Sequence, residues 1–188
     1  MFFKSFQFSL ILLSFLFPFF FTKAQNDPEK FAKSITEQEL KELLYVYASD
    51  YFDGRETGTK GQKIAVDFLR SFYQTHKIAP VKGTQNYFQP FELTLKKELV
   101  STENVLAIIP GSEKPEEYII LSSHLDHIGN HNGKINNGAD DDGSGNVALL
   151  EIAEAFKLAS ESGQGPKRSI VFLPVSYTHL TLPTNREV

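Results

Sequence analysis

The 188-residue sequence contains no cysteine. This absence excludes disulfide bonds, zinc sites built from thiolates, cysteine nucleophiles and iron–sulfur clusters. Any metal site must therefore use nitrogen and oxygen ligands. A mature chain of roughly 150 residues buries enough surface to fold without covalent staples, provided that its sheet is complete.

Positively charged residues are also few, with 19 Lys and Arg against 23 Asp and Glu, which gives a net charge of −4. Lys4 and Lys23 lie in the first 24 residues, which contain no acidic residue, so removing that segment would leave 17 cations against 23 anions and a net charge of −6. Nucleic acids and anionic membrane surfaces both require a basic patch. We therefore expect no nucleic-acid partner, and a soluble protein able to hold cations.

The N-terminus resembles a secretory signal peptide, with a cation at Lys4, an apolar run over residues 6–21 and the small residue Ala24 before Gln25. A membrane anchor is the alternative. The run contains Pro18 and is shorter than the ~20 apolar residues of a spanning helix. We expect cleavage after Ala24, export to the periplasm or the medium, and no stable membrane anchor after cleavage.

Residues 174–188 resemble the translation of a transposase-based sequencing-library adapter. The fixed adapter codons encode the stretch from Val175 to Thr184, and the next fixed bases encode Val188 and a stop. The alternative is a natural coil. We predict that residues 174–188 are an artefactual tail, that the natural chain diverges after Leu173, and that residues 25–173 are the N-terminal part of one domain.

Apolar periodicity predicts three helices and four strands. The helices are expected over residues 36–51, where Thr36 and Glu39 form a capping box, over 59–76 and over 147–158. The strands are expected over 87–95, at a sheet edge because Pro90 cannot donate to a central ladder, and over 104–109, 117–121 and 169–173. The segment 117–121 is continuously apolar, so we expect it to be buried on both faces. The order strand, loop, helix, strand predicts an α/β fold with a mostly parallel or mixed sheet and helices on both faces.

Candidate site residues follow the strand at 117–121. His124 and Asp126 are two positions apart, so both side chains leave the same face of an extended segment. Gly138-Ala-Asp-Asp-Asp-Gly-Ser-Gly145 comes fourteen residues after His124, directly before a helix. Three adjacent carboxylates repel one another unless a cation or a helix N-terminus offsets their charge. Imidazole and carboxylate ligands together are typical of zinc sites.

The acidic loop has two other interpretations. The aspartates are also preferred helix N-cap residues in a solvated loop, although three of them beside a His-x-Asp segment favour a metal. A calcium-binding EF-hand requires Gly at loop position six. Placing Gly143 there puts Gly138 and Leu149 at the first and twelfth positions, where oxygen ligands are needed, so the register fails. His127 and His131 also lie near the site, and we expect both to be solvated loop residues.

With these motifs, the chain resembles the M28 family of zinc exopeptidases, mostly secreted aminopeptidases. The resemblance extends from about Ile35, through Arg55-Glu-Thr-Gly58 and Asn86-Tyr-Phe-Gln-Pro-Phe91, to Leu173. It implies an active site with two Zn²⁺ ions, in which His124 binds one zinc, Asp141 bridges both, and Asp126 orients His124. The expected fold is zinc-exopeptidase-like and incomplete, and the expected partners are peptide substrates with a free N-terminus.

The resemblance also implies residues that this sequence lacks. Family members carry a Glu-Glu pair after the next strand, one Glu as general base and one as a ligand, followed by a further Asp and a final His. Here that strand ends at Leu173, and neither His179 nor Glu187 lies in a matching context. The general-base Glu is therefore expected to be absent from this chain.

The sequence leaves the following functions open. The first is a fragment of a secreted di-zinc aminopeptidase, inactive in itself. The second is a catalytically dead module that binds ligands in a metal-lined cleft. The third is another M28 activity, namely dipeptidase, carboxypeptidase or glutaminyl cyclase. A Glu pair encoded after Leu173 in the intact gene would separate the first from the second.

Overall fold

A computed structural model of the chain describes residues 27–95 and 97–177. The helical elements are α1 (Pro28–Ala32), α2 (Glu37–Tyr47), η1 (Asp50–Arg55), α3 (Lys60–Thr75), η2 (Ala139–Gly143) and α4 (Ser144–Glu161). The strands are β1 (Ala79–Pro80), β2 (Phe88–Leu95), β3 (Glu98–Val105), β4 (Ala107–Ile109), β5 (Lys114–His124), β6 (Asn130–His131), β7 (Lys134–Ile135) and β8 (Arg168–Val175). The predicted signal peptide, His179 and Glu187 lie outside the described residues.

The main sheet has four strands in the order β1-β4-β8-β5. β5 and β8 are parallel and are joined through α4, whereas β4 pairs antiparallel with both β8 and β1. β2 and β3 form a separate antiparallel hairpin. The predicted α/β class with a mixed sheet is confirmed.

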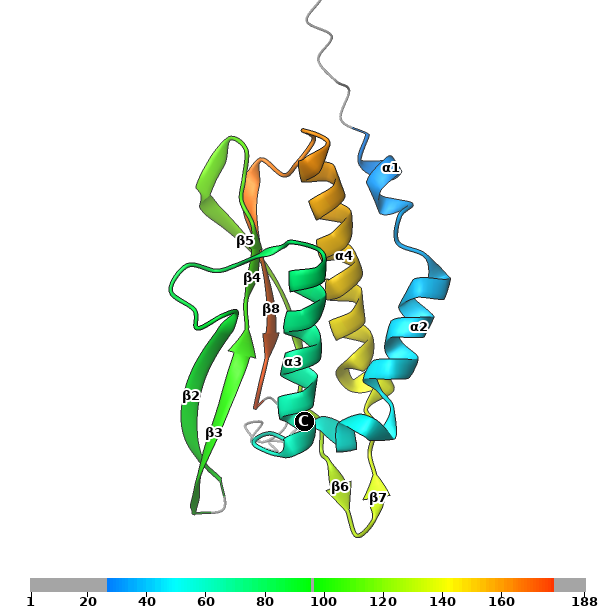
Figure 1. Cartoon of the computed structure of the whole chain (residues 1–188), viewed down its shortest axis with the longest axis vertical. Coiled ribbons are helices and arrows are strands. Elements are labelled where there is room, and N and C mark those ends of the chain that lie inside the picture. The colour runs from blue at the N-terminus through cyan, green and yellow to red at the C-terminus, as the bar shows by residue number, and fades with distance from the viewer. Residues whose placement is uncertain (1–26, 96, 178–188) are drawn as a thin grey trace, which may run out of the picture.

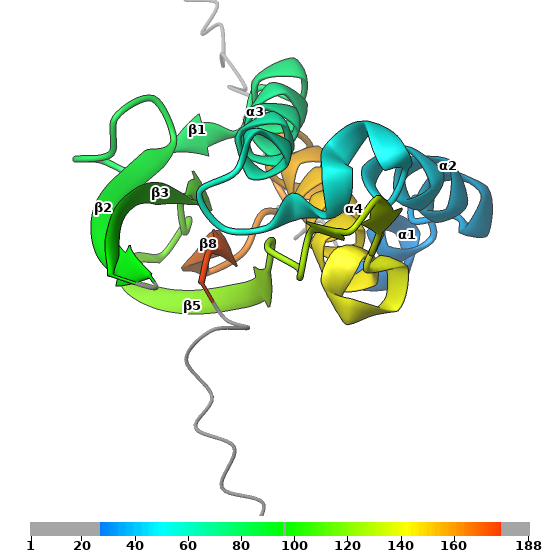
Figure 2. The same cartoon turned by 90° about the horizontal axis from the view of Figure 1, so that it is seen from below.

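Helices α3 and α4 lie on one side of the main sheet, and the β2–β3 hairpin lies on the other (Figures 1 and 2). In the described part of the chain, a hairpin rather than a helix thus approaches the second side. None of the described helices combines the length and the apolar character needed to cross a bilayer.

The core lies between the sheet and the two long helices. Leu69 and Tyr73 of α3, Leu150 of α4, Val105 of β3 and Phe172 of β8 are all fully buried. Burial of one such large apolar side chain contributes roughly 1.5–3 kcal/mol. This packing fixes the N-terminus of α4 relative to the end of β5, where the candidate site lies.

The helix predictions are confirmed with small shifts. The Thr36 hydroxyl accepts a hydrogen bond of 3.2 Å from the Glu39 amide, which is the capping interaction expected at the start of α2. Thr59 is the N-cap of α3. Tyr51 does not continue α2, because the chain turns into η1 at Asp50, and its side chain is exposed.

The prediction that residues 117–121 are buried on both faces is wrong. β5 is the last strand of the main sheet, and β8 is its one partner among the described residues. Tyr118 is 55% exposed, Ile119 46% and Ile120 58%. Continuous apolar character indicated burial, but the sequence pattern does not say how many strands flank a given strand.

Two other strands are longer than predicted. β3 begins at Glu98, six residues before the strand predicted over 104–109. β8 continues past Leu173 to Val175, and the buried Ser176 hydroxyl donates to the Glu103 carbonyl over 2.7 Å. The predicted boundary between the natural chain and its tail at Leu173 stays a prediction.

Candidate metal centre

The candidate ligands lie where a strand end meets a helix start. His124 is the last residue of β5, and η2 with its three aspartates directly precedes α4. Ligands of open α/β sheets bind beyond the carboxyl ends of the strands, at the N-termini of helices. The fold therefore brings together two motifs that lie fourteen residues apart in sequence.

His124 and Asp141 converge on each other. The His124 Nε2 atom lies 2.9 Å from the Asp141 Oδ1 atom. The His124 side chain is 16% exposed and the Asp141 side chain 59%, so the pair is open to solvent on the Asp141 side. The two residues that the M28 resemblance assigns as metal ligands are thus neighbours.

The second ring nitrogen of His124 is held by Asp126. His124 Nδ1 lies 3.0 Å from the Asp126 backbone oxygen and 3.9 Å from its carboxylate Oδ1. A carbonyl oxygen can only accept, so Nδ1 carries the proton of this hydrogen bond. Nε2 then faces a carboxylate, and this contact is favourable when a second proton or a cation lies between them.

Asp126 is fixed in a buried environment. Its side chain is almost fully buried, and the Thr57 hydroxyl donates to its Oδ2 over 3.2 Å. The orienting role predicted for Asp126 fits this position, although its backbone carbonyl is closer to the imidazole than its carboxylate is. The Asp126 carboxylate therefore interacts with the His124 ring electrostatically, over 3.9 Å, and the carbonyl makes the hydrogen bond.

Asp142 ties the acidic loop to both neighbouring elements. Its carboxylate accepts hydrogen bonds from the His124 amide over 3.2 Å and from the Gly145 amide over 3.1 Å. The buried Asn146 side chain donates to the His124 carbonyl over 2.6 Å and to the Asp142 carbonyl over 2.9 Å. These bonds hold the end of β5 against the first turn of α4, and so hold Asp141 between them.

Arg55 is a buried cation beneath the site. Its guanidinium donates to the backbone carbonyls of Leu125 (3.0 Å), Asn137 (2.7 Å), Gly138 (2.8 Å) and Tyr47 (3.1 Å). Burial lowers the pKa of Arg55 below its ordinary value, against the opposing effect of Tyr47 and the site aspartates. A single side chain thus joins η1, the His124–Asp126 segment and the acidic loop.

Gly138 begins the acidic loop in a left-handed conformation, with φ of 55°. A Cβ atom at this position would lie 2.5 Å from the His127 ring. Both the backbone angle and the close approach require glycine here. The loop can therefore turn toward Asp141 only with Gly at position 138.

Of the two other histidines considered, His127 lies beside Asp141 and His131 lies on β6. The His127 Nδ1 atom lies 3.8 Å from Asp141 Oδ2, and its side chain is only 12% exposed, so the prediction of a solvated loop residue does not hold for it. His131 lies on β6 of the β6–β7 hairpin, exposed as predicted. The segment His124-Leu-Asp-His127 gave a spacing signal for His127 that the sequence reasoning did not use.

Sequence reasoning also missed the residues that hold the ligands. Arg55 was named only as part of the M28 resemblance, whereas its guanidinium binds backbone carbonyls of three separate segments, at Tyr47, at Leu125 and at residues 137–138. Nothing in the sequence indicated that Thr57 and Asn146 hold the candidate ligands, apart from their positions next to the motifs. Hydrogen bonds to backbone carbonyls leave no periodic trace in a sequence.

The donors present fit a zinc ion in part. Imidazole and carboxylate are natural zinc ligands, but a catalytic zinc normally has three protein ligands and a water. Over residues 27–95 and 97–177, no group of three or more His, Asp or Glu side chains is arranged to hold a metal ion. His124 and Asp141 therefore form an incomplete ligand set.

Comparison with known protein families finds a match for the segment that contains the candidate ligands. The sequence model of peptidase family M28 matches residues 104–176, which include β5, the acidic loop, α4 and β8. This segment of the chain is thus similar to peptidase family M28, a family of metallopeptidases.

Curated relatives include peptidases of two kinds. "Probable glutamate carboxypeptidase LAMP1" of Arabidopsis thaliana is 32% identical over 96 residues, which are 51% of this chain and 12% of the relative. "Aminopeptidase NAALADL1" of Rattus norvegicus is 38% identical over 76 residues, which are 40% of this chain and 9% of the relative. The chain therefore spans only about an eighth or less of the length of these relatives.

The fold resembles solved zinc-exopeptidase-like structures. The glutaminyl cyclase of Macrostomum lignano superposes with a TM-score of 0.61 at 19% identity, covering 82% of this chain and 41% of that one. At this identity the likeness concerns the fold alone. It extends well beyond residues 104–176, so most of the described chain belongs to one architecture.

Proposed function

We propose that this chain is part of an exported di-zinc aminopeptidase that hydrolyses the N-terminal residue of peptides. The observation that carries the proposal is the convergence of His124 Nε2 and Asp141 Oδ1 at 2.9 Å, at the end of β5 and within the M28 segment. His124 would bind one Zn²⁺, and Asp141 would bridge two.

Zinc bound there would polarise the substrate carbonyl and lower the pKa of a water molecule toward neutrality. The chain's own residues prepare the ligands for it. The Asp126 carbonyl holds the proton on His124 Nδ1, so Nε2 directs its lone pair toward Asp141, where a cation would bind between the two side chains. Asp142, Asn146 and Arg55 hold the two ligand segments at a fixed separation.

Charge at the site favours a substrate N-terminus over a C-terminus. Asp140 and Asp141 are exposed, and Glu56 is partly exposed nearby, where its side chain approaches Gly129. Arg55 is buried and donates to backbone carbonyls, so it does not offer a cation to a substrate carboxylate. The described part of the site therefore suits the ammonium group of a free N-terminus. The 38% identical aminopeptidase supports this choice.

The activity would belong to a longer protein. The chain covers 12% or less of the two curated relatives, and the general-base Glu and remaining ligands expected from the M28 resemblance would come from its natural continuation. We propose that the 188-residue chain binds zinc weakly and does not turn over substrate, whereas the exported parent begins at Gln25 after signal cleavage.

The test uses the parent protein, amplified from source DNA across the codon for Leu173. The parent should release p-nitroaniline from an aminoacyl-p-nitroanilide, lose this activity with a chelator and regain it with Zn²⁺. N-acylated dipeptides and N-terminal glutaminyl peptides should react more slowly by at least tenfold. Preferential cleavage of N-acylated dipeptides would replace the proposal with a carboxypeptidase, and zinc binding without any turnover would indicate a catalytically dead module.

A further inference from the structure

A second site lies away from the candidate metal centre, between α2, α3 and α4. The cavity there has a volume of about 350 Å³. Four carboxylic acids line it, Glu39 and Glu42 from α2 and Glu151 and Glu154 from α4. We propose that this cavity binds a small organic cation, a primary ammonium group on an apolar stem.

Glu151 is the central residue of this cavity. It is only 4% exposed, it borders the cavity, and its carboxyl makes no hydrogen bond or ion pair with any other residue of the described chain. The carboxyl oxygens are not among the fully enclosed unpaired side-chain atoms of the described chain, so they open onto the cavity. A carboxyl that is this little exposed is poorly hydrated when it is ionised, which favours a cation beside it. The open side of this carboxyl is the cavity itself, so a ligand there would supply the missing donor.

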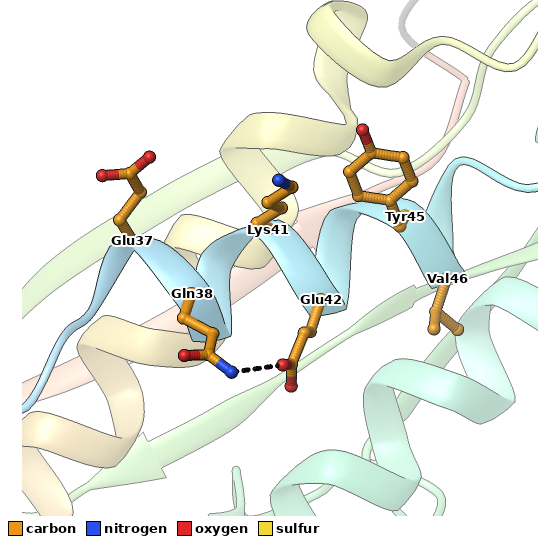
Figure 3. A pocket seen from close by; sticks show the side chains of 6 residues that line it. All are labelled: Glu37, Gln38, Lys41, Glu42, Tyr45 and Val46. Carbon is orange, nitrogen blue, oxygen red and sulfur yellow. Dashed lines mark hydrogen bonds between the residues drawn. The ribbon is translucent and has the colours of Figure 1, made fainter.

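The remaining acids add negative charge at the same place. The Thr36 hydroxyl donates to Glu39 over 2.6 Å, and Gln38 donates to Glu42 over 2.9 Å (Figure 3). Figure 3 shows Gln38 and Glu42 on one side of α2, with Lys41 pointing to the other side. Neutral hydroxyl and amide donors leave the negative charge of these two acids in place.

His76 is the single side chain lining the described cavity that can carry a positive charge. Its Nδ1 atom already faces the Glu154 carboxylate at 3.4 Å, and its ring stacks on Phe72 with centroids 4.1 Å apart. One imidazole offsets at most one of the four acids. Burial, and then Glu39 and Glu154, raise the pKa of Glu151 to about 7, as expected for a carboxyl that lacks a counter-ion.

The apolar part of the cavity selects the kind of cation. Phe68 and Phe72 of α3 and Leu43 and Val46 of α2 complete its wall. An alkyl stem would pack on these side chains while the ammonium, with three donors, reaches Glu151; the nearby ring faces also attract a cation. A bare metal ion fits less well, because the described residues offer no arrangement of three or more acidic or imidazole ligands. The volume is within the range of small-molecule sites.

The test is calorimetric titration of the purified 188-residue chain with hexylamine at pH 8. Glu151→Gln keeps the size of the side chain and removes its charge, so it should weaken binding by about tenfold or more. The matched control is Glu161→Gln, an exposed acid on the same helix, paired with Lys157, that should leave binding unchanged. Hexanol and hexanoate should not bind measurably. Equal binding to Glu151→Gln, equal binding of hexanol, or no binding of hexylamine would overturn the proposal.

The pH dependence gives an independent measurement. A cation binds the ionised form of Glu151, so affinity should rise about tenfold between pH 6 and pH 8 and a proton should be released near pH 7. This dependence should persist in His76→Gln and disappear in Glu151→Gln. The opposite pattern would assign the titration to His76 and overturn the proposal. A tripeptide with one Lys and blocked ends tests the other source of an ammonium group, and binding of this peptide without binding of hexylamine would also overturn it.

Discussion

Acidic side chains lie in two places near helix α4, one before its first turn and one in its middle, and their surroundings differ. In the loop before its first turn, Asp142 accepts two backbone amides, and the Thr57 hydroxyl serves Asp126 in the adjoining strand end. Two turns further along, Glu151 is buried with no donor in the described chain. Hydrogen bonds to a carboxylate favour its charged form, and burial without them favours the neutral form. The first set thus receives donors from the chain itself, whereas burial raises the pKa of Glu151 to about 7.

The largest effect is expected from removal of the bridging ligand. Asp141→Ala in the parent protein should reduce kcat/KM by more than the roughly 10–100-fold that is typical for loss of a residue that only supports a ligand. The exposed Asp67 of α3, which pairs with Arg70 away from the site, is the control, and Asp67→Asn should change kcat/KM by less than threefold. A fully active Asp141→Ala parent would show that the metal lies elsewhere.

Replacement of Arg55 tests whether one buried cation holds together the segments around the candidate site. Arg55→Met would leave four backbone carbonyls without their donor, so the free energy of unfolding should fall by roughly 3 kcal/mol or more. Arg168→Met, at an exposed residue paired with Glu117, should cost less than about 1 kcal/mol. Urea unfolding of the 188-residue chain measures both, and equal losses would contradict the role given to Arg55.

The pH dependence of the free energy of unfolding tests the account of the buried Glu151. Its pKa is raised by burial to about 7, so its contribution to stability is fully present below the unfolded pKa of about 4.5 and is lost as pH rises through about 7. The loss should be at most roughly 3 kcal/mol, because one pKa unit corresponds to about 1.4 kcal/mol. Glu151→Gln should remove this dependence from urea unfolding curves between pH 4.5 and pH 8. An unchanged pH profile would mean that Glu151 finds a donor in solution.

Smaller effects are expected from changes at Asp126 and at its hydrogen-bond donor Thr57. The Asp126 backbone carbonyl, which is the closer acceptor for His124 Nδ1, is kept in this variant. Loss of the carboxylate charge should therefore reduce kcat/KM of the parent by about tenfold, at the low end of the range for residues behind a metal ligand. Thr57→Val, which removes the hydroxyl that holds Asp126, should act in the same direction and by less. A reduction as large as that of Asp141→Ala would mean that Asp126 itself binds the metal.

Much of the fold could be predicted from local patterns. Thr36 and Thr59 marked helix starts. Pro90 predicted an edge strand, and β2 is one of the two strands of a separate hairpin. The position of β5 could not be predicted, because an apolar run is compatible with a central or an outer strand. The part of β3 before Asn104 was not predicted, because Glu98, Ser101 and Glu103 make its sequence polar and it is stabilised by pairing with β2.

For the site, the sequence indicated the ligand pair His124 and Asp141 and the supporting Asp126, all of which the structure brings together. It did not indicate Arg55 beneath them, because four bonds to carbonyls depend on the fold and not on a motif. It also did not indicate Glu151, whose helical position looks like that of any partly buried residue. Its lack of a donor is a property of three helices packed together.

The central claim, that His124 and Asp141 hold a metal, is tested most directly by imidazole nitrogen NMR of the 188-residue chain during titration with Zn²⁺. The account predicts that the His124 Nε2 resonance shifts toward a metal-bound position while His131 stays unchanged, and that Asp141→Ala removes the His124 response. A response at His131, or an unchanged His124 response in Asp141→Ala, would contradict it.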